Sequence, residues 1–276
     1  MQQSLFLDST IQLERLLYTA AHRQRIQRNL QDKRIYTSST VYMEFKRGIL
    51  QDIHYLQALI NRYAPDSAEL VRLSDIDRWL AIGEGNFSSR SRDRCKLVTA
   101  ELKDEFDEPH VQQMELVVFL EEFSLLLDDY FFDVELADGT YFDIHAQGTY
   151  IDEAGCVLSQ RDFPPGDILH HRLSCRASGT ECTLDQFLAR HERELDAIYH
   201  RLLAMSQNQR DEKAFTALKR VMEGGFQQAL GQRNCWALGD VIIALETPQD
   251  AMIYTTNTKH FAPLCAALGK QLYIPT

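Results

Sequence analysis

The feature that most constrains this fold is a recurring order of short apolar run, polar turn and helix-like pattern. The apolar run Leu5-Phe6-Leu7 ends in a turn containing Ser9 and Thr10, and a second run, Ile35-Tyr36-Thr37, ends in Ser38-Ser39-Thr40. Such short runs indicate buried strands, and Ser or Thr in the turn favours a helix N-cap, here Ser9 or Thr10. The sequence therefore predicts strands at 5–7 and 35–37 and helices over 11–30 and 41–63.

The end of the chain returns to the same order. An apolar run over 251–255 is followed by the turn Thr256-Asn257, a helical pattern over 261–268 and a last apolar run at 272–274. Strands that alternate with helices form parallel sheets covered by those helices. We therefore predict an α/β fold, a three-layer α/β/α sandwich whose central parallel sheet is built from both ends of the chain.

The middle of the chain has a different pattern. Helical patterns over 66–82 and 111–130 are separated by a polar stretch, and residues 133–158 alternate apolar and polar positions around Asp138-Gly139. Alternation about an Asp-Gly turn predicts antiparallel hairpins. Helical patterns resume after Thr183. Residues 63–184 are thus expected to form an inserted subdomain of helices and β-hairpins, between the two parts of the main domain.

The charge of the chain is concentrated in this middle part. The net charge is −11, yet residues 97–160 hold sixteen acidic residues and a single basic one, Lys103, so that the rest of the chain is mildly basic. The acidic block is interpreted as a solvated surface, a docking surface for a basic partner, or a shield over a ligand-binding edge of the predicted sheet. We expect residues 63–184 to control substrate access or to recruit a protein partner or a second copy, and not to be catalytic.

Composition narrows the class of protein further. With 45% hydrophobic and 25% charged residues, the chain has the balance of a globular protein. No apolar run approaches the roughly 18 residues of a membrane span, and no leader is seen at Met1, so we expect no membrane partner and a cytoplasmic location. The six cysteines are expected to be reduced thiols, and zinc binding by Cys156, Cys175 and Cys182 is the less favoured alternative.

Four polar residues are expected to meet at one edge of the predicted sheet. Asp8 ends the first strand, Glu44 lies in the first turns of the helix after the second strand, and Asp240 lies near a helix start. Asn257 follows the strand at 251–255. Ligands bind beyond the carboxyl ends of parallel strands, and carboxylate and amide oxygens are typical ligands of Mg²⁺ or Mn²⁺. The alternative for each residue alone is a structural role in a cap or a turn.

Four motifs in chain order carry a resemblance to a known family. They are Leu5-Phe6-Leu7-Asp8-Ser9-Thr10, Thr37-Ser38-Ser39-Thr40-Val41-Tyr42-Met43-Glu44-Phe45, Leu238-Gly239-Asp240-Val241-Ile242-Ile243-Ala244 and Ile253-Tyr254-Thr255-Thr256-Asn257-Thr258-Lys259-His260-Phe261. On these residues the chain resembles the PIN-domain nucleases over 1–62 and 185–276. The resemblance implies that Asp8, Glu44 and Asp240 form the acidic metal-binding set, and that Asn257 takes a fourth position.

The resemblance also implies an activity. A PIN-like domain would be a Mg²⁺- or Mn²⁺-dependent endonuclease that hydrolyses phosphodiester bonds, with single-stranded RNA favoured over DNA as its substrate and with Asp8, Glu44, Asp240 and Asn257 as its catalytic residues. In that case Asp8 and Asp240 bind the metal, Glu44 binds it or orients the attacking water, and Asn257 adds a neutral ligand or hydrogen bond. The alternative is a protein that keeps the fold and binds nucleic acid, or acts as a scaffold, without turnover.

Two basic clusters could contact a phosphate backbone. The cluster flanking the first helix consists of Arg23, Arg25, Arg28, Lys33 and Arg34. For this cluster, nucleic-acid binding and a solvated helix face are equal alternatives. A second cluster consists of Arg90, Arg92, Arg94 and Lys96. Its polar surroundings favour a disordered or substrate-gating loop.

Overall fold

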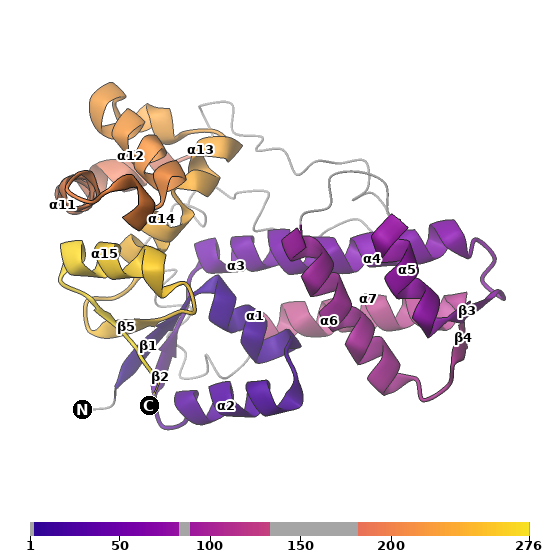
Figure 1. The fold of residues 1–276 in the computed structure, drawn as a ribbon. Coiled ribbons are helices and arrows are strands. Elements are labelled where there is room, and N and C mark those ends of the chain that lie inside the picture. Colours follow the sequence, from indigo (N-terminus) through magenta and orange to yellow (C-terminus); the bar gives the residue numbers. More distant parts are fainter. Residues whose placement is uncertain (1–2, 83–88, 133–181, 276) are drawn as a thin grey trace.

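A parallel sheet of four strands joins the two ends of the chain (Figure 1). The strands are β1 (Ser4–Leu7), β2 (Arg34–Tyr36), β5 (Ala251–Tyr254) and β6 (Gln271–Leu272), and their order in the sheet is β2-β1-β5-β6. In the central pair, Leu5 lies opposite Met252 and Leu7 opposite Tyr254. The prediction that 5–7 and 251–255 share one parallel sheet is confirmed.

Most of the described chain is helical. The computed structural model describes residues 3–82, 89–132 and 182–275, and within these ranges no helix has the length and apolar content needed to cross a membrane. The helices before residue 133 are α1 (Ser9–Leu17), α2 (Ala20–Leu30), α3 (Ser39–Phe45), α4 (Gln51–Tyr63), α5 (Leu73–Ile82), α6 (Ser89–Glu105) and α7 (Gln113–Phe132). Those after residue 181 are α10 (Leu184–Arg190), α11 (Glu192–Leu203), α12 (Glu212–Gly224), α13 (Gln232–Ala237), α14 (Gly239–Glu246) and α15 (Thr258–Leu268).

The order of the strands determines which face each helix covers. The connection from β1 to β2 leads toward one edge of the sheet, and the connection from β5 to β6 leads toward the other. Because crossovers between parallel strands are right-handed, their helices must lie on opposite faces. Figure 1 shows α2 on one side of the sheet and α15 on the other. The fold is therefore mixed α/β and compatible with the layered α/β/α arrangement expected from the sequence.

A group of helices, α4 to α7, extends to one side of the sheet (Figure 1). Apolar residues of α4 and α7, among them Ile53, Leu56, Leu116 and Leu120, are buried in a core that is continuous with that of the sheet. An antiparallel ribbon of β3 (Leu70–Arg72) and β4 (His110–Gln112) lies at the far end of this group. The hairpins predicted over 133–158 lie outside the described residues, and the boundary of the insertion at 63–184 stays a prediction.

Two predictions for this middle part are wrong. The segment 66–82 is not helical throughout, because β3 precedes α5, and the polar stretch after it contains the helix α6. In α6 the buried positions Cys95, Val98, Thr99 and Leu102 follow the helical period. Charged residues surround these positions, so the apolar stripe of α6 is thin and the stretch has the composition of a loop.

The first predicted helix is also interrupted. The pattern over 11–30 forms two helices, since Tyr18 has an extended backbone between α1 and α2. The N-cap of α1 is Asp8, whose carboxylate accepts hydrogen bonds from the backbone N–H groups of Thr10 and Ile11. The expectation that Ser9 or Thr10 caps this helix is therefore wrong by one or two residues. The pattern over 41–63 is helical, with a π-helical segment, Lys46–Leu50, between α3 and α4.

A buried lysine holds α14 against the edge of the sheet. Nζ of Lys270, just before β6, donates hydrogen bonds to the carbonyl oxygens of Ala244 at 2.6 Å, Leu245 at 3.4 Å and Thr247. The carbonyls of a last helical turn have no partner within the helix, so a cation there satisfies them. Burial lowers the pKa of Lys270 to about 8. This contact fixes the helix that carries Asp240.

We expect Lys270→Met to lower the free energy of unfolding by about 2 kcal/mol at pH 7, because it leaves buried carbonyl groups without a hydrogen-bond donor. Urea unfolding followed by circular dichroism measures this difference. The matched control is Lys219→Met, which removes an exposed lysine paired with Glu223 on α12 and should change stability by less than about 0.5 kcal/mol. Equal effects of the two substitutions would contradict this role of Lys270.

Candidate carboxylate site at the sheet edge

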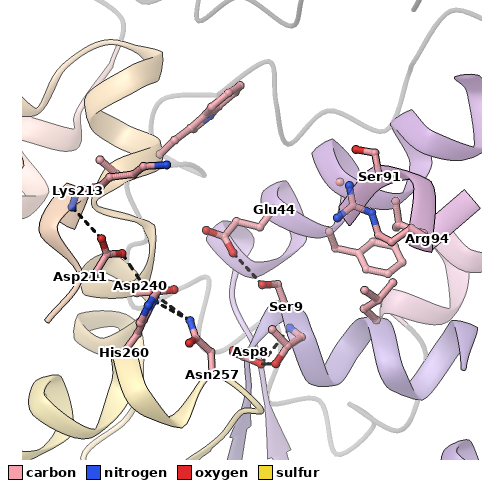
Figure 2. A pocket seen from close by; sticks show the side chains of 17 residues that line it. Asp8, Ser9, Glu44, Ser91, Arg94, Asp211, Lys213, Asp240, Asn257 and His260 are labelled. Carbon is pink, nitrogen blue, oxygen red and sulfur yellow. Dashed lines mark hydrogen bonds and ion pairs between the residues drawn. The ribbon is translucent and has the colours of Figure 1, made fainter. Parts of the chain in front are cut away.

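A pocket of about 610 Å³ lies beyond the carboxyl ends of β1 and β5. The four residues singled out in the sequence, Asp8, Glu44, Asp240 and Asn257, all line it (Figure 2). They come from the end of β1, from α3, from the first turn of α14 and from the start of α15. The fold thus brings together residues that lie far apart in the chain.

Asp8 is the most buried acid of the pocket, with 2% of its surface exposed. Its Oδ1 accepts hydrogen bonds from N of Thr10 at 3.0 Å, N of Ile11 at 3.1 Å and Oγ1 of Thr10 at 2.7 Å. Its Oδ2 accepts from Oγ1 of Thr255 at 2.6 Å. Burial raises the pKa of Asp8 to about 6 and outweighs these hydrogen bonds, which lower it, while the charge of Asp240 raises it further. Asp8 is therefore still ionised at neutral pH, at a cost in stability that a nearby cation would offset.

Glu44 is held between the first turn of α1 and the start of α14, the helix that carries Asp240. Oγ of Ser9 donates a hydrogen bond of 2.8 Å to Oε2 of Glu44 (Figure 2). Ser9 directly follows Asp8, so two consecutive residues supply one carboxylate of the pocket and hold another. The other oxygen, Oε1, lies against Gly239, where a Cβ would come within 2.3 Å of it. Glycine at position 239 therefore leaves the space that this carboxylate occupies.

Asp240 and Asn257 belong to a hydrogen-bonded group that includes His260. Nδ2 of Asn257 lies 3.3 Å from Oδ2 of Asp240, and Nδ1 of His260 lies 3.0 Å from the same oxygen. Oδ2 of Asp211, the N-cap of α12, lies 3.6 Å from Nδ1 of His260. The hydrogen bond to Asp240, with the charges of Asp240 and Asp211, raises the pKa of His260 against a smaller opposing effect of burial. A positive charge is therefore favoured at this point.

The same group could hold a cation in place of that proton. One ligand atom from each of Asp211, Asp240 and His260 lies within 4.8 Å of the others. Carboxylate oxygens fit Mg²⁺ or Mn²⁺, and an imidazole nitrogen among them is more typical of transition-metal ions, so the donor set fits Mn²⁺ better than Mg²⁺. Asp8, Glu44 and Asn257 offer further oxygens in the same pocket.

The sequence motifs do not predict Asp211 and His260 as members of this site. His260 follows Asn257 by three residues, and this spacing places both on one face of α15, so the helical period could have indicated it. Asp211 precedes the amphipathic pattern of α12, a position typical of an N-cap. Nothing in the sequence pairs α12 with α14, because that contact depends on how the helices pack.

The first basic cluster lies away from this pocket, which none of its five residues lines. Arg23 forms an ion pair of 3.0 Å with Glu101 on α6, and Lys33 lies over the ring of Tyr273. Arg28 and Lys33 line a separate pocket of about 740 Å³ beside α2 and β2. The structure therefore does not bring this cluster to the carboxylates.

The second basic cluster is part of the helix α6, so the expectation of a disordered or gating loop is wrong for its described residues. Arg94 lines the carboxylate pocket and pairs with Asp52 of α4, whereas Arg92 and Lys96 are exposed. Ser91, from the same helix, also lines the pocket. Of the three cysteines considered for zinc, Cys156 and Cys175 lie outside the described residues, and Cys182 is partly buried.

Charges of both signs meet in the pocket. Its acids are Asp8, Glu44, Asp211 and Asp240, and they face Arg94, Lys213 and His260.

Comparisons of the chain with models of protein families, with curated proteins and with solved structures found no significant match. What the pocket can do follows from its side chains: it can bind a cation at the carboxylates and an anion beside Lys213, whereas Arg94 lies across the pocket and is paired with Asp52.

Asp8→Asn should make the protein more stable at neutral pH in metal-free buffer. Because the pKa of the Asp8 carboxyl is raised in the folded state, the folded wild type binds more protons between about pH 4 and 6 and loses stability as the pH rises through this range. The loss is about 3 kcal/mol, from a shift of about two pH units. Asparagine carries no charge, so the Asp8→Asn variant does not lose this stability as the pH rises.

The measurement is urea unfolding in EDTA at pH 4.5 and at pH 7.5. The stability difference between Asp8→Asn and wild type should be larger at pH 7.5 than at pH 4.5. Asp250→Asn, which changes an exposed acid before β5, is the matched control and should show the same difference at both values. A difference for Asp8→Asn that is independent of pH would show that burial does not raise this pKa.

Proposed function

We propose that this chain is a metal-dependent endonuclease that hydrolyses phosphodiester bonds, most readily in single-stranded RNA. The proposal includes a PIN-like form of the α/β/α fold, formed by residues 1–62 and 185–276. It is supported by the parallel sheet, which joins β1 to β5, and by the position of the four motifs at its carboxyl edge. A second candidate, a nucleic-acid-binding or scaffold protein without turnover, is tested by the same experiment.

The observation that carries this proposal is the meeting of Asp8, Glu44 and Asp240 in one pocket. Carboxylates repel one another, so a group of them is favourable only where a cation or bound protons offset their charge. A divalent cation, when bound, lowers the pKa of a water molecule and offsets charge on the phosphate. Both effects accelerate phosphodiester hydrolysis.

The proposed roles follow from the contacts of each side chain. Asp8, fixed by four hydrogen bonds, and Asp240, at the start of α14, would bind the cation. Glu44, steadied by Ser9, would bind it or orient the attacking water. Asn257 would add a neutral ligand and hold Asp240 through its amide. Lys213 and Arg94, at different sides of the pocket, would contact phosphates of the substrate, since cations attract them and restrict their position.

Residues 63–184 are proposed to control access to this pocket or to recruit a protein partner or a second copy. Two residues of α6, Ser91 and Arg94, line the pocket, so this part of the chain forms some of its wall. Glu101, further along α6, pairs with Arg23 and ties the helix to α2. A partner that moved α6 would therefore change the shape of the pocket.

Asp8→Asn and Asp240→Asn should each abolish cleavage of a labelled, unstructured RNA in Mn²⁺ buffer, because each removes a charge that the cation requires. We expect a loss of at least about 100-fold in kcat/KM, of the size seen when a group that stabilises the transition state is removed. Asp250→Asn is the matched control and should cleave like wild type.

The same assay is run with tRNA, single-stranded DNA and duplex DNA to define the substrate. Each variant is also titrated with Mn²⁺ while its thermal unfolding is followed, since a ligand that binds the folded state raises the midpoint. Wild type should be stabilised and the two variants less so. If wild type binds RNA but cuts none of these substrates, the protein is the non-catalytic binder.

Gly239→Ala should reduce cleavage while leaving the overall fold intact. The new methyl group would occupy the place of Oε1 of Glu44, so that this carboxylate must move within the pocket. A displacement of about 1 Å in a catalytic group can lower the rate by up to about 100-fold. Because Glu44→Ala itself removes a proposed catalytic residue, the control is thermal unfolding, in which the loss of stability caused by Gly239→Ala should be absent in a Glu44→Ala background. An equal loss in both backgrounds would assign Gly239 a different role.

A further inference from the structure

An exposed tryptophan lines the carboxylate pocket. Trp236, on α13, has 37% of its surface exposed and is one of two tryptophans in the chain. The other, Trp79 on α5, is 8% exposed and stacks on Tyr63 with ring centroids 5.4 Å apart. Single exposed apolar side chains are common on protein surfaces, but an aromatic ring that lines a pocket together with charged groups is typical of ligand sites.

The surroundings of Trp236 match a nucleic-acid strand. The helix α13 packs against α12, which carries Lys213, and against α14, which carries Asp240. Lys213 is exposed and lines the same pocket. One wall thus offers, within a single pocket, an aromatic ring, a cation and the proposed metal-binding carboxylate. A nucleotide has groups that the ring and the lysine can bind, namely a flat base and a charged phosphate.

We propose that Trp236 stacks on a nucleobase of the bound strand, beside the phosphate that is cleaved, and that Lys213 contacts a neighbouring phosphate. This inference rests on the proposed function and specifies its substrate as single-stranded nucleic acid with an accessible base. Bases within a duplex already stack on their neighbours, whereas a single strand can turn a base onto an aromatic side chain. Stacking is tolerant of base identity, so little sequence preference arises at this position.

Intrinsic fluorescence tests the stacking without any cleavage. Trp79→Phe keeps a ring against Tyr63 and leaves Trp236 as the single tryptophan. This protein is titrated with a short oligonucleotide, once in EDTA and once in Ca²⁺, and with an abasic oligonucleotide of the same length and charge. We expect the base-containing strand to quench the fluorescence and the abasic strand to quench it far less. Equal quenching by both strands would overturn the inference.

Steady-state kinetics with RNA provide the second test. Trp236→Leu keeps an apolar side chain but removes the aromatic ring, and it should raise KM by about 5- to 150-fold, the range for loss of one stacked base, with kcat little changed. Trp236→Phe keeps a ring and should stay within a few-fold of wild type. If Leu and Phe have the same effect, Trp236 serves packing and not stacking.

The two tests separate this inference from the proposed function. Base-dependent quenching without any cleavage by wild type would support the stacking site and refute the nuclease. Cleavage by wild type without base-dependent quenching would refute the stacking site and leave the nuclease proposal intact. The absence of both cleavage and base-dependent quenching would refute both.

Discussion

Parallel pairing of β1 with β5 is the constraint on which the rest of the structure depends. It places Asp8, the residue after β1, beside the end of β5, so that N of Asp8 donates to the carbonyl oxygen of Tyr254 and Oδ2 accepts from Thr255. Because parallel strands point the same way, each helix that follows a strand begins at this one edge. The ends of the chain, far apart in sequence, thereby form one surface.

Asp8 links this architecture to the chemistry of the pocket. One oxygen caps α1 and the other accepts from Thr255, so the side chain fixes the angle at which α1 leaves the sheet. These bonds also hold the carboxylate in a single orientation in a buried place, although burial disfavours its charge. The structural role of Asp8 and its proposed metal-binding role are therefore compatible, because the hydrogen bonds of the helix cap also orient the carboxylate that would bind the metal.

The sequence was most informative where the pattern was local and repeated. The strand positions and the residues at their ends could be predicted, because an apolar run ending in Asp or Asn before a helix has few structural interpretations. The helix α6 and the strands β3 and β4 could not, since the buried positions of α6 alternate with charges and each of these strands buries a single valine. Asp211 joins the pocket only through packing of α12 against α14, which no local pattern encodes.

Charge balance explains why the four carboxylates of the pocket favour a bound cation. Asp240 and Asp211 lie around His260, whose raised pKa shows that their field favours a cation at this point, whereas the Asp8 carboxyl is driven toward its neutral form. A divalent cation would satisfy both conditions, since it would replace the proton at His260 and stabilise the charge of Asp8. Arg94 and Lys213 lie at the same pocket but on different helices, α6 and α12. The carboxylates therefore favour a cation, and Lys213, which is exposed at the same pocket, favours an anion from outside the protein.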